Sequence, residues 1–247
     1  MQHVHGFSLR RPVVTRMGLG QTLAIFGAGS ALLFVGTHGL IPMLSRLTGQ
    51  EPVLFWFLIG GLGVFVPLLL LAVVLLHAES TPFDRRLWTE RLRFRAMNGG
   101  DWLWSFGGML LIGVLGAGLA TGLGMLLGHV DQQPPFMRFE PLTPERVWLL
   151  ALWLPFWVLN IMGEEILWRG VLLPRQEQTF GRWAWLVNTG GWLLFHLAFG
   201  WQLLVLLLPI LVIMPYVVQR RGNSWVGVLI HAGLNGPGFL AIAFGFI

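Results

Sequence analysis

The chain has 247 residues, of which 11% are charged and 55% hydrophobic, with 13 Trp and 18 Phe against one Tyr. A soluble domain has roughly 25% charged residues, and a globule of this size cannot bury so many apolar side chains. The composition therefore excludes a soluble enzyme, a nucleic-acid-binding protein and a disordered linker. It predicts a chain surrounded largely by a lipid bilayer, and the absence of Cys excludes disulfides and a Cys nucleophile.

Seven apolar stretches are long enough to cross a bilayer as helices of roughly 17–25 residues or more. They lie at residues 18–44, 53–77, 102–127, 146–173, 182–200, 202–218 and 224–246. The sequence thus predicts an all-α, polytopic transmembrane helical bundle of about seven spans. Six to eight spans are compatible with the pattern, because only Gly200 and Trp201 separate the fifth stretch from the sixth.

The net charge of +5 comes from 16 Arg, no Lys and 11 acidic residues. Most of the arginines gather in alternate connections: Arg10, Arg11 and Arg16; Arg85, Arg86, Arg91, Arg93 and Arg95; Arg175 and Arg182; Arg220 and Arg221. The intervening connections have fewer, with Arg46 in one and Arg138 and Arg146 in another. Arg-rich connections stay cytoplasmic in membrane proteins. This pattern predicts a cytoplasmic N-terminus and an external Ile247, and we expect the membrane to be a bacterial inner membrane.

Segment 84–100 mixes Leu, Trp and Phe with Arg and Glu. We expect a cytoplasmic amphipathic helix at the membrane interface that ends at Asn98-Gly99-Gly100, with a plain basic loop as the alternative.

Few polar side chains occur at bilayer depth, and all the notable ones follow residue 160: Glu164, Glu165, Arg169, His196, His231 and Asn235. Such residues usually mark function, because a charge in lipid is costly. Residues four apart share a helix face, so Glu165 is expected to pair with Arg169, and His231 to project beside Asn235. Glu164 has no cationic neighbour on its own helix, and we expect its partners to be His196 and His231.

A buried carboxylate with two imidazoles and an amide can add water to a carbonyl group. Glu164 is a candidate general base and acid, and His196 can orient the water or hold a metal. His231 and Asn235 can donate hydrogen bonds to an oxyanion. Neither a Ser-His-Asp set nor an H-E-x-x-H motif is present. A purely structural ion-pair network remains the alternative.

The ordered motifs resemble those of a known family. Glu164-Glu165 with Arg169, then His196 four residues after an aromatic residue, then His231 with Asn235, is similar to the pattern of the CAAX prenyl protease and bacteriocin-processing (CPBP) family of intramembrane proteases. The aromatic residue four positions before His196 is Trp192 here, where the family usually has Phe. The resemblance covers roughly residues 146–247, a CPBP-like catalytic helical core, and leaves 1–145 as amino-terminal membrane helices.

The resemblance implies that Glu164 and His196 activate water, that His231 and Asn235 stabilise the oxyanion, and that Glu165 and Arg169 are structural. It leaves open whether a metal takes part: Zn²⁺ held by Glu164, His196 and His231, or a metal-free glutamate mechanism.

These motifs predict an intramembrane endopeptidase, reached from the cytoplasmic side, that hydrolyses a peptide bond of a membrane-associated or lipidated peptide or protein. Its partners would be that substrate and the lipid bilayer, and not nucleic acid. Two alternatives use the same residues: a proton-coupled membrane transporter, and a non-catalytic membrane immunity or scaffold protein.

Overall fold

The computed structural model describes residues 14–79 and 84–246, and within these ranges it contains helices and no strands. Six helical stretches of this part are long and apolar enough to cross a membrane. They are Leu19–Thr48, Pro52–Ala78, Gly99–Leu127, Leu149–Phe199, Trp201–Arg221 and Ser224–Ala243. The predicted all-α membrane bundle is therefore confirmed, whereas Arg10, Arg11 and Ile247 lie outside the described residues.

Several of these stretches combine α-helical and π-helical segments. The first joins α1 (Leu19–Phe34), η1 (Val35–Leu40) and α2 (Ile41–Thr48), and the second joins α3 (Pro52–Phe55), η2 (Trp56–Phe65) and α4 (Val66–Ala78). Three other stretches are single α-helices: α6 (Gly99–Leu127), α10 (Trp201–Arg221) and α11 (Ser224–Ala243).

The stretch Leu149–Phe199 contains the fourth and fifth predicted spans. Its 51 residues would extend about 77 Å as one helix, far more than a bilayer core of about 30 Å. The chain instead reverses at Gly181, whose φ of 53° favours glycine. Before the reversal come α7 (Leu149–Glu164), η5 (Glu165–Leu172) and α8 (Leu173–Phe180); after it come η6 (Gly181–Trp183), α9 (Ala184–His196) and η7 (Leu197–Phe199). The expected boundary at Gly200 is also present, with φ of 83° and a new helix from Trp201.

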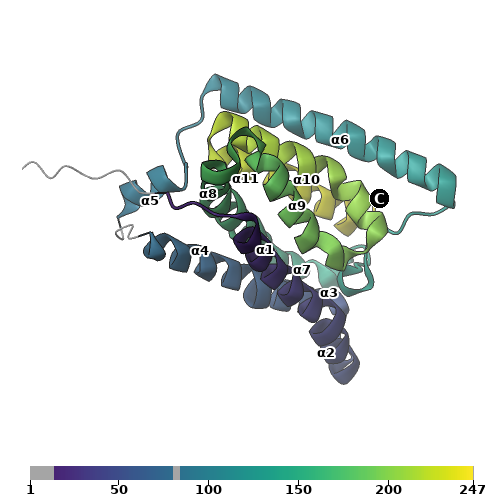
Figure 1. Ribbon diagram of the computed structural model, residues 1–247. Helices are drawn as coiled ribbons and strands as arrows, with labels where there is room; N and C mark the ends of the chain where they lie inside the picture. The colour runs from purple at the N-terminus through teal and green to yellow at the C-terminus, as the bar shows by residue number, and fades with distance from the viewer. Residues whose placement is uncertain (1–13, 80–83, 247) are drawn as a thin grey trace, which may run out of the picture.

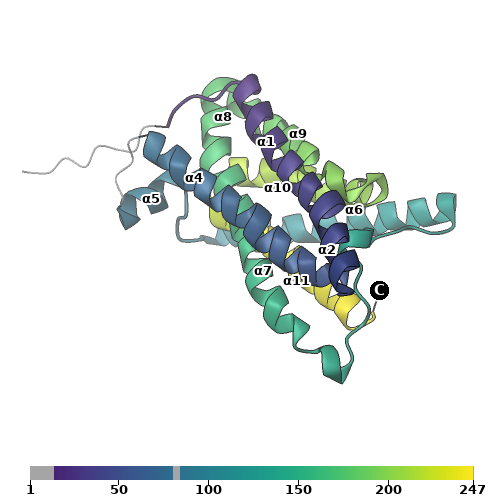
Figure 2. The same cartoon turned by 90° about the horizontal axis from the view of Figure 1, so that it is seen from below.

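The amino-terminal helices pack against the carboxy-terminal ones. Helix α1 contacts α9, α4 contacts η5, and η2 contacts α7, while α6 packs on α10 and α11. Figures 1 and 2 show α6 on one side of the bundle and α1 with α4 on the other, with α8 to α11 between them. Of the polar motif residues, His196, His231 and Asn235 lie on two of these middle helices, α9 and α11, and Glu164 lies on α7, which contacts η2 and α11.

Helix α10 contains Pro215, which has no N–H to donate to the carbonyl of Leu211 in an α-helical register. The hydroxyl of Thr189 on α9 donates to that carbonyl at 3.0 Å. A membrane helix tolerates proline when a neighbouring side chain replaces the lost hydrogen bond, and here the replacement also links α9 to α10.

The expected amphipathic helix over 84–100 is shorter than predicted. Helix α5 covers only Arg85–Arg91. Asn98 does not end a helix but begins α6: its Oδ1 accepts from the backbone N–H of Asp101 at 3.0 Å, and the Asp101 carboxylate accepts from the N–H of Asn98 at 3.1 Å. This reciprocal capping box satisfies two amides that the helix itself leaves free.

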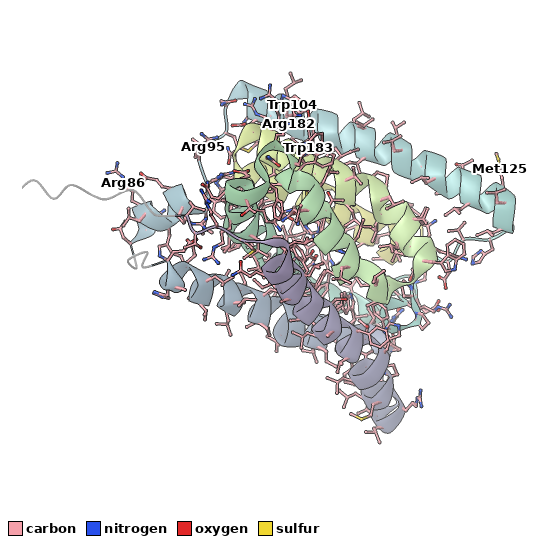
Figure 3. The ribbon with its side chains drawn as sticks, in the orientation of Figure 1. Arg86, Arg95, Trp104, Met125, Arg182 and Trp183 are labelled. Atoms are coloured by element: carbon pink, nitrogen blue, oxygen red, sulfur yellow. The ribbon has the colours of Figure 1, made fainter. Side chains whose placement is uncertain are left out.

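The arginine-rich connections meet at one end of the bundle, formed by residues 84–98, 175–182 and 220–223, which we call the arginine end. Ion pairs join them: Arg91 and Arg175 with Glu79, Arg93 with Glu177, and Arg221 with Asp101. Figure 3 shows Arg86, Arg95 and Arg182 toward the end where α6 begins, and Met125 at the far end of α6.

The opposite end, which we call the loop end, is formed by residues 49–51, 128–148 and 197–202. Arg146 pairs with Glu51 there at 2.5 Å, and the side chain of Gln202 accepts from the backbone N–H of Asp131 at 2.7 Å. The connections thus gather on the two ends in the alternation expected from the arginine pattern.

Candidate active site

A cavity of about 360 Å³ lies among the inner helices, and all four predicted catalytic residues line it. Glu164 comes from the end of α7, His196 from the end of α9, and His231 and Asn235 from one face of α11. Glu164, His196 and His231 are buried, with 2%, 6% and 5% of their surface exposed, and Asn235 is more open. Most of the remaining lining is apolar.

Glu164 is held by two hydrogen-bond donors that the sequence analysis did not assign to it. The amide Nδ2 of Asn160 donates to Oε1 at 2.9 Å, and the indole Nε1 of Trp192 donates to Oε2 at 2.5 Å. The expected partners, His196 and His231, make no recorded hydrogen bond to Glu164 within the described residues. Asn160 stands four residues before Glu164, so the spacing rule that paired Glu165 with Arg169 could have found it.

His196 is oriented by the backbone of its own helix. Its Nδ1 lies 2.9 Å from the carbonyl oxygen of Trp192. A carbonyl only accepts, so Nδ1 carries the hydrogen and Nε2 is left to accept one. The rings of Trp192 and Phe199 stand edge-on to the imidazole, at centroid distances of 5.3 and 5.1 Å. The residue is thus held as a fixed tautomer with one basic nitrogen free.

Glu165 points away from Glu164 and links two other site residues. Its Oε1 lies 3.3 Å from Nη1 of Arg169 and 2.9 Å from Nδ1 of His231. Gly227 leaves the room for it, because a Cβ there would fall 2.5 Å from Oε2 of Glu165. The expected Glu165–Arg169 pair is therefore present, and it also positions His231.

Asn235 lies one helical turn beyond His231 and lines the same cavity. No hydrogen bond to its side chain is recorded among the described residues, so the amide is available to a ligand. The cation of Arg169 lies 3.6 Å from the centre of the Trp192 ring, which joins the ion pair to the residue that holds Glu164.

The cavity lies toward the loop end of the bundle. Its walls include Val53, Trp153 and Leu203, each near the start of a helix that begins at that end, and Gln132 from the loop itself. We expected access from the cytoplasmic side, which the arginine pattern assigns to the arginine end. The cavity is instead nearer the opposite end.

The residues proposed for a metal do not gather as a ligand set. Glu164, His196 and His231 share the cavity, but among the described residues no group of three His, Cys, Asp or Glu could hold a metal ion. Both oxygens of Glu164 already accept hydrogen bonds from Asn160 and Trp192. The arrangement does not fit Zn²⁺, and no chemical step below uses a metal.

The fold and the site together define an integral membrane protein, all-helical in its described part, with Glu, His and Asn side chains around one internal cavity. Residues 146–236 match the family model described as type II CAAX prenyl endopeptidase, Rce1-like. This match covers just over a third of the chain and includes Glu164 to Asn235. It confirms the resemblance to the CAAX prenyl protease and bacteriocin-processing family. No curated protein and no solved structure gives a significant match.

Proposed function

We propose that the protein is an intramembrane endopeptidase that hydrolyses a peptide bond in a membrane-associated or lipidated peptide or protein. The observation that supports this most directly is the convergence of Glu164, His196, His231 and Asn235 on one largely apolar cavity. Residues 146–247 form the catalytic core in this proposal, and the described helices of 1–145 pack around it. The arginine end is cytoplasmic, as in a bacterial inner-membrane protein with a cytoplasmic N-terminus.

In the proposed mechanism Glu164 takes a proton from water while the water oxygen bonds to the scissile carbonyl carbon, and the C=O electron pair moves to the oxygen. His196 orients the water through its free Nε2. As the tetrahedral intermediate collapses, the C–N bond breaks and Glu164 returns the proton to the leaving nitrogen. Asn160 and Trp192 hold the carboxylate in position throughout.

His231 and Asn235 stabilise the oxyanion of the intermediate. The Asn235 amide donates directly. His231 donates through Nε2, which requires a hydrogen on both ring nitrogens, because Nδ1 already donates to Glu165. Loss of one such positioned donor costs about 3–4 kcal/mol of transition-state stabilisation.

The proposal predicts that Glu164→Gln, which removes the general base, lowers cleavage at least about 100-fold, and that His196→Ala, which removes the side chain that orients the water, also lowers cleavage. The measurement is a proteomic comparison of cells that carry the wild type or Glu164→Gln, in which uncut precursors accumulate in the variant. Glu90→Gln, on the exposed face of α5, is the matched control and cleaves normally.

Thermal melting in detergent checks that the variants fold. A folded Glu164→Gln protein with full activity would falsify the proposal. Proton-coupled uptake by the wild type into proteoliposomes, without any accumulated precursor in cells, would favour the transporter instead.

A further inference from the structure

We propose that the catalytic cavity receives its substrate from the loop end, the extracytoplasmic face, and that a second cavity there binds the water-exposed flank of the same peptide. The substrate class is a peptide segment with apolar residues at the cleavage site and a cationic side chain beside them. This inference rests on the proposed protease function, and it reverses the expected direction of access.

The arginine side of the catalytic cavity is closed by packed side chains. Trp168, Arg169 and Leu172 lie on η5, between the site and the arginine end, and each is 0% exposed. Pro174 has no N–H, so the carbonyl of Gly170 lacks the donor that an α-helical register would give it. The guanidinium of Arg91 donates to this carbonyl at 3.0 Å. A peptide approaching from this side would have to break a buried polar contact and displace a packed layer.

The loop side of the catalytic cavity has a second cavity beside it in place of a packed layer. This second cavity, of about 280 Å³, is lined by His38, Asp131 and Gln202 among others. It shares two lining residues, Phe199 and Leu203, with the catalytic cavity. The two spaces are therefore neighbours, separated by these two apolar side chains, and an extended peptide can occupy both.

Asp131 indicates which side chain the second cavity prefers. Its Oδ1 accepts from the N–H of Gln133 at 3.1 Å, and its backbone N–H is held by Gln202 at 2.7 Å. No recorded hydrogen bond uses Oδ2 among the described residues, and no arginine lines this cavity. His38 bonds through Nδ1 to Thr37 at 2.9 Å. A fixed carboxylate at the rim of the cavity favours a cationic substrate group.

The direction of access can be tested by cysteine labelling, since the chain has no Cys and needs no other substitution. Leu203→Cys places a thiol on the wall shared by the cavities, and Ala96→Cys places one in the exposed connection at the arginine end. Intact spheroplasts are treated with a membrane-impermeant maleimide, before and after permeabilisation. We expect labelling at position 203 in intact spheroplasts and at position 96 only after permeabilisation.

Labelling at position 203 should also block cleavage, whereas labelling at position 96 should not. Loop-end access is overturned if the thiol at position 203 reacts only after permeabilisation or does not react at all. It is also overturned if a fully labelled Leu203→Cys protein still cleaves its substrate. The labelling pattern can be read without any protease activity. If wild type cleaves nothing while position 203 is labelled, the proposed function fails and access stands.

The substrate preference is tested with fluorogenic apolar peptides that carry one flanking Arg or, as the counterpart, Gln. Wild type should cleave the Arg peptide with the higher kcat/KM, and Asp131→Asn should lower that value about two- to fivefold, as for a solvent-exposed ion pair. Glu140→Gln is the matched control, since this exposed acid of the same loop lines neither cavity. Equal kcat/KM for both peptides in wild type, or an equal loss in both variants, overturns the role of Asp131.

Discussion

At the scale of single residues, Trp192 connects the parts of the site. Its indole N–H donates to Glu164, its carbonyl accepts from His196, and its ring lies against the cation of Arg169. The sequence alone treats Trp in place of the family's Phe as a change from one large aromatic to another. The structure shows a difference, because phenylalanine has no hydrogen to donate to the carboxylate.

Trp192→Phe isolates this one hydrogen bond, since Phe keeps an aromatic ring for Arg169 and the backbone carbonyl for His196. A hydrogen bond to a charged group contributes about 1.5–3 kcal/mol, and about 1.4 kcal/mol is a factor of ten in rate. We therefore expect kcat to fall about tenfold or more, with KM little changed, in steady-state cleavage assays.

Trp168→Phe is the matched control. Trp168 is fully buried nearby, and its Nε1 has no hydrogen-bond partner, so the substitution removes an N–H that supports nothing. We expect unchanged kcat for this variant. Equal losses of kcat in both variants would show that aromatic packing, and not the bond to Glu164, sets the rate.

Much of the candidate site follows from local rules. His231 with Asn235, and Glu165 with Arg169, are four residues apart, and the scarcity of charge in lipid drew attention to them. The contact between Trp192 and Glu164 joins two helices and depends on how α7 and α9 pack, which no spacing along the chain encodes.

At the scale of helices, the Gly190-Gly191 pair shows how α9 meets α1. Only Gly191 of this pair is closely packed against α1. A Cβ on Gly191 would fall 2.3 Å from the ring of Phe26 on α1, whereas a Cβ on Gly190 would meet nothing within 4 Å. Because α9 also holds His196, this crossing helps to position the site.

Gly191→Ala should destabilise the protein by about 1–3 kcal/mol, as expected when an atom is forced into a packed interface. Gly190→Ala should leave stability unchanged or raise it by up to about 1 kcal/mol, because alanine is the better helix former. Thermal melting in one detergent compares the two variants. Equal melting temperatures would mean that α1 shifts freely against α9.

The spans were predictable because hydropathy and length alone identify them. The helix boundaries were harder to predict, as Asn98 shows. Asn-Gly-Gly is typical of a helix C-terminus, but Asn is also a common helix N-cap. Asp101, three residues later, completes the capping box. Attention to that spacing would have placed the start of α6 correctly.

At the scale of the whole molecule, the arginine pattern predicted which connections share an end, but not which end the cavity lies near. Glu164 is close to mid-bundle, between Leu149 and Phe180. Packing at the arginine end has closed that side.

Glu79 is at the centre of that closure. Its buried carboxylate accepts from Arg91 at 2.6 Å, from Arg175 at 2.7 Å and from the hydroxyl of Thr15 at 3.1 Å, and so joins four segments of the chain. Burial alone would raise the pKa of Glu79, but hydrogen bonds and charge from Arg91 and Arg175 outweigh it and hold the pKa below its ordinary value of 4.5.

Glu79→Gln should therefore destabilise the protein by about 3 kcal/mol or more at neutral pH, because two arginines lose their buried counter-charge. A carboxylate with a lowered pKa stabilises the fold fully above its ordinary pKa and loses that contribution as the pH falls through the folded value. The difference in melting temperature between wild type and Glu79→Gln should thus shrink as the pH falls below the ordinary pKa of 4.5.

Glu90→Gln, which removes an exposed pair with Arg86, should melt like wild type at every pH. A gap for Glu79→Gln that stays constant with pH would mean that the side chain contributes through packing and not through its charge.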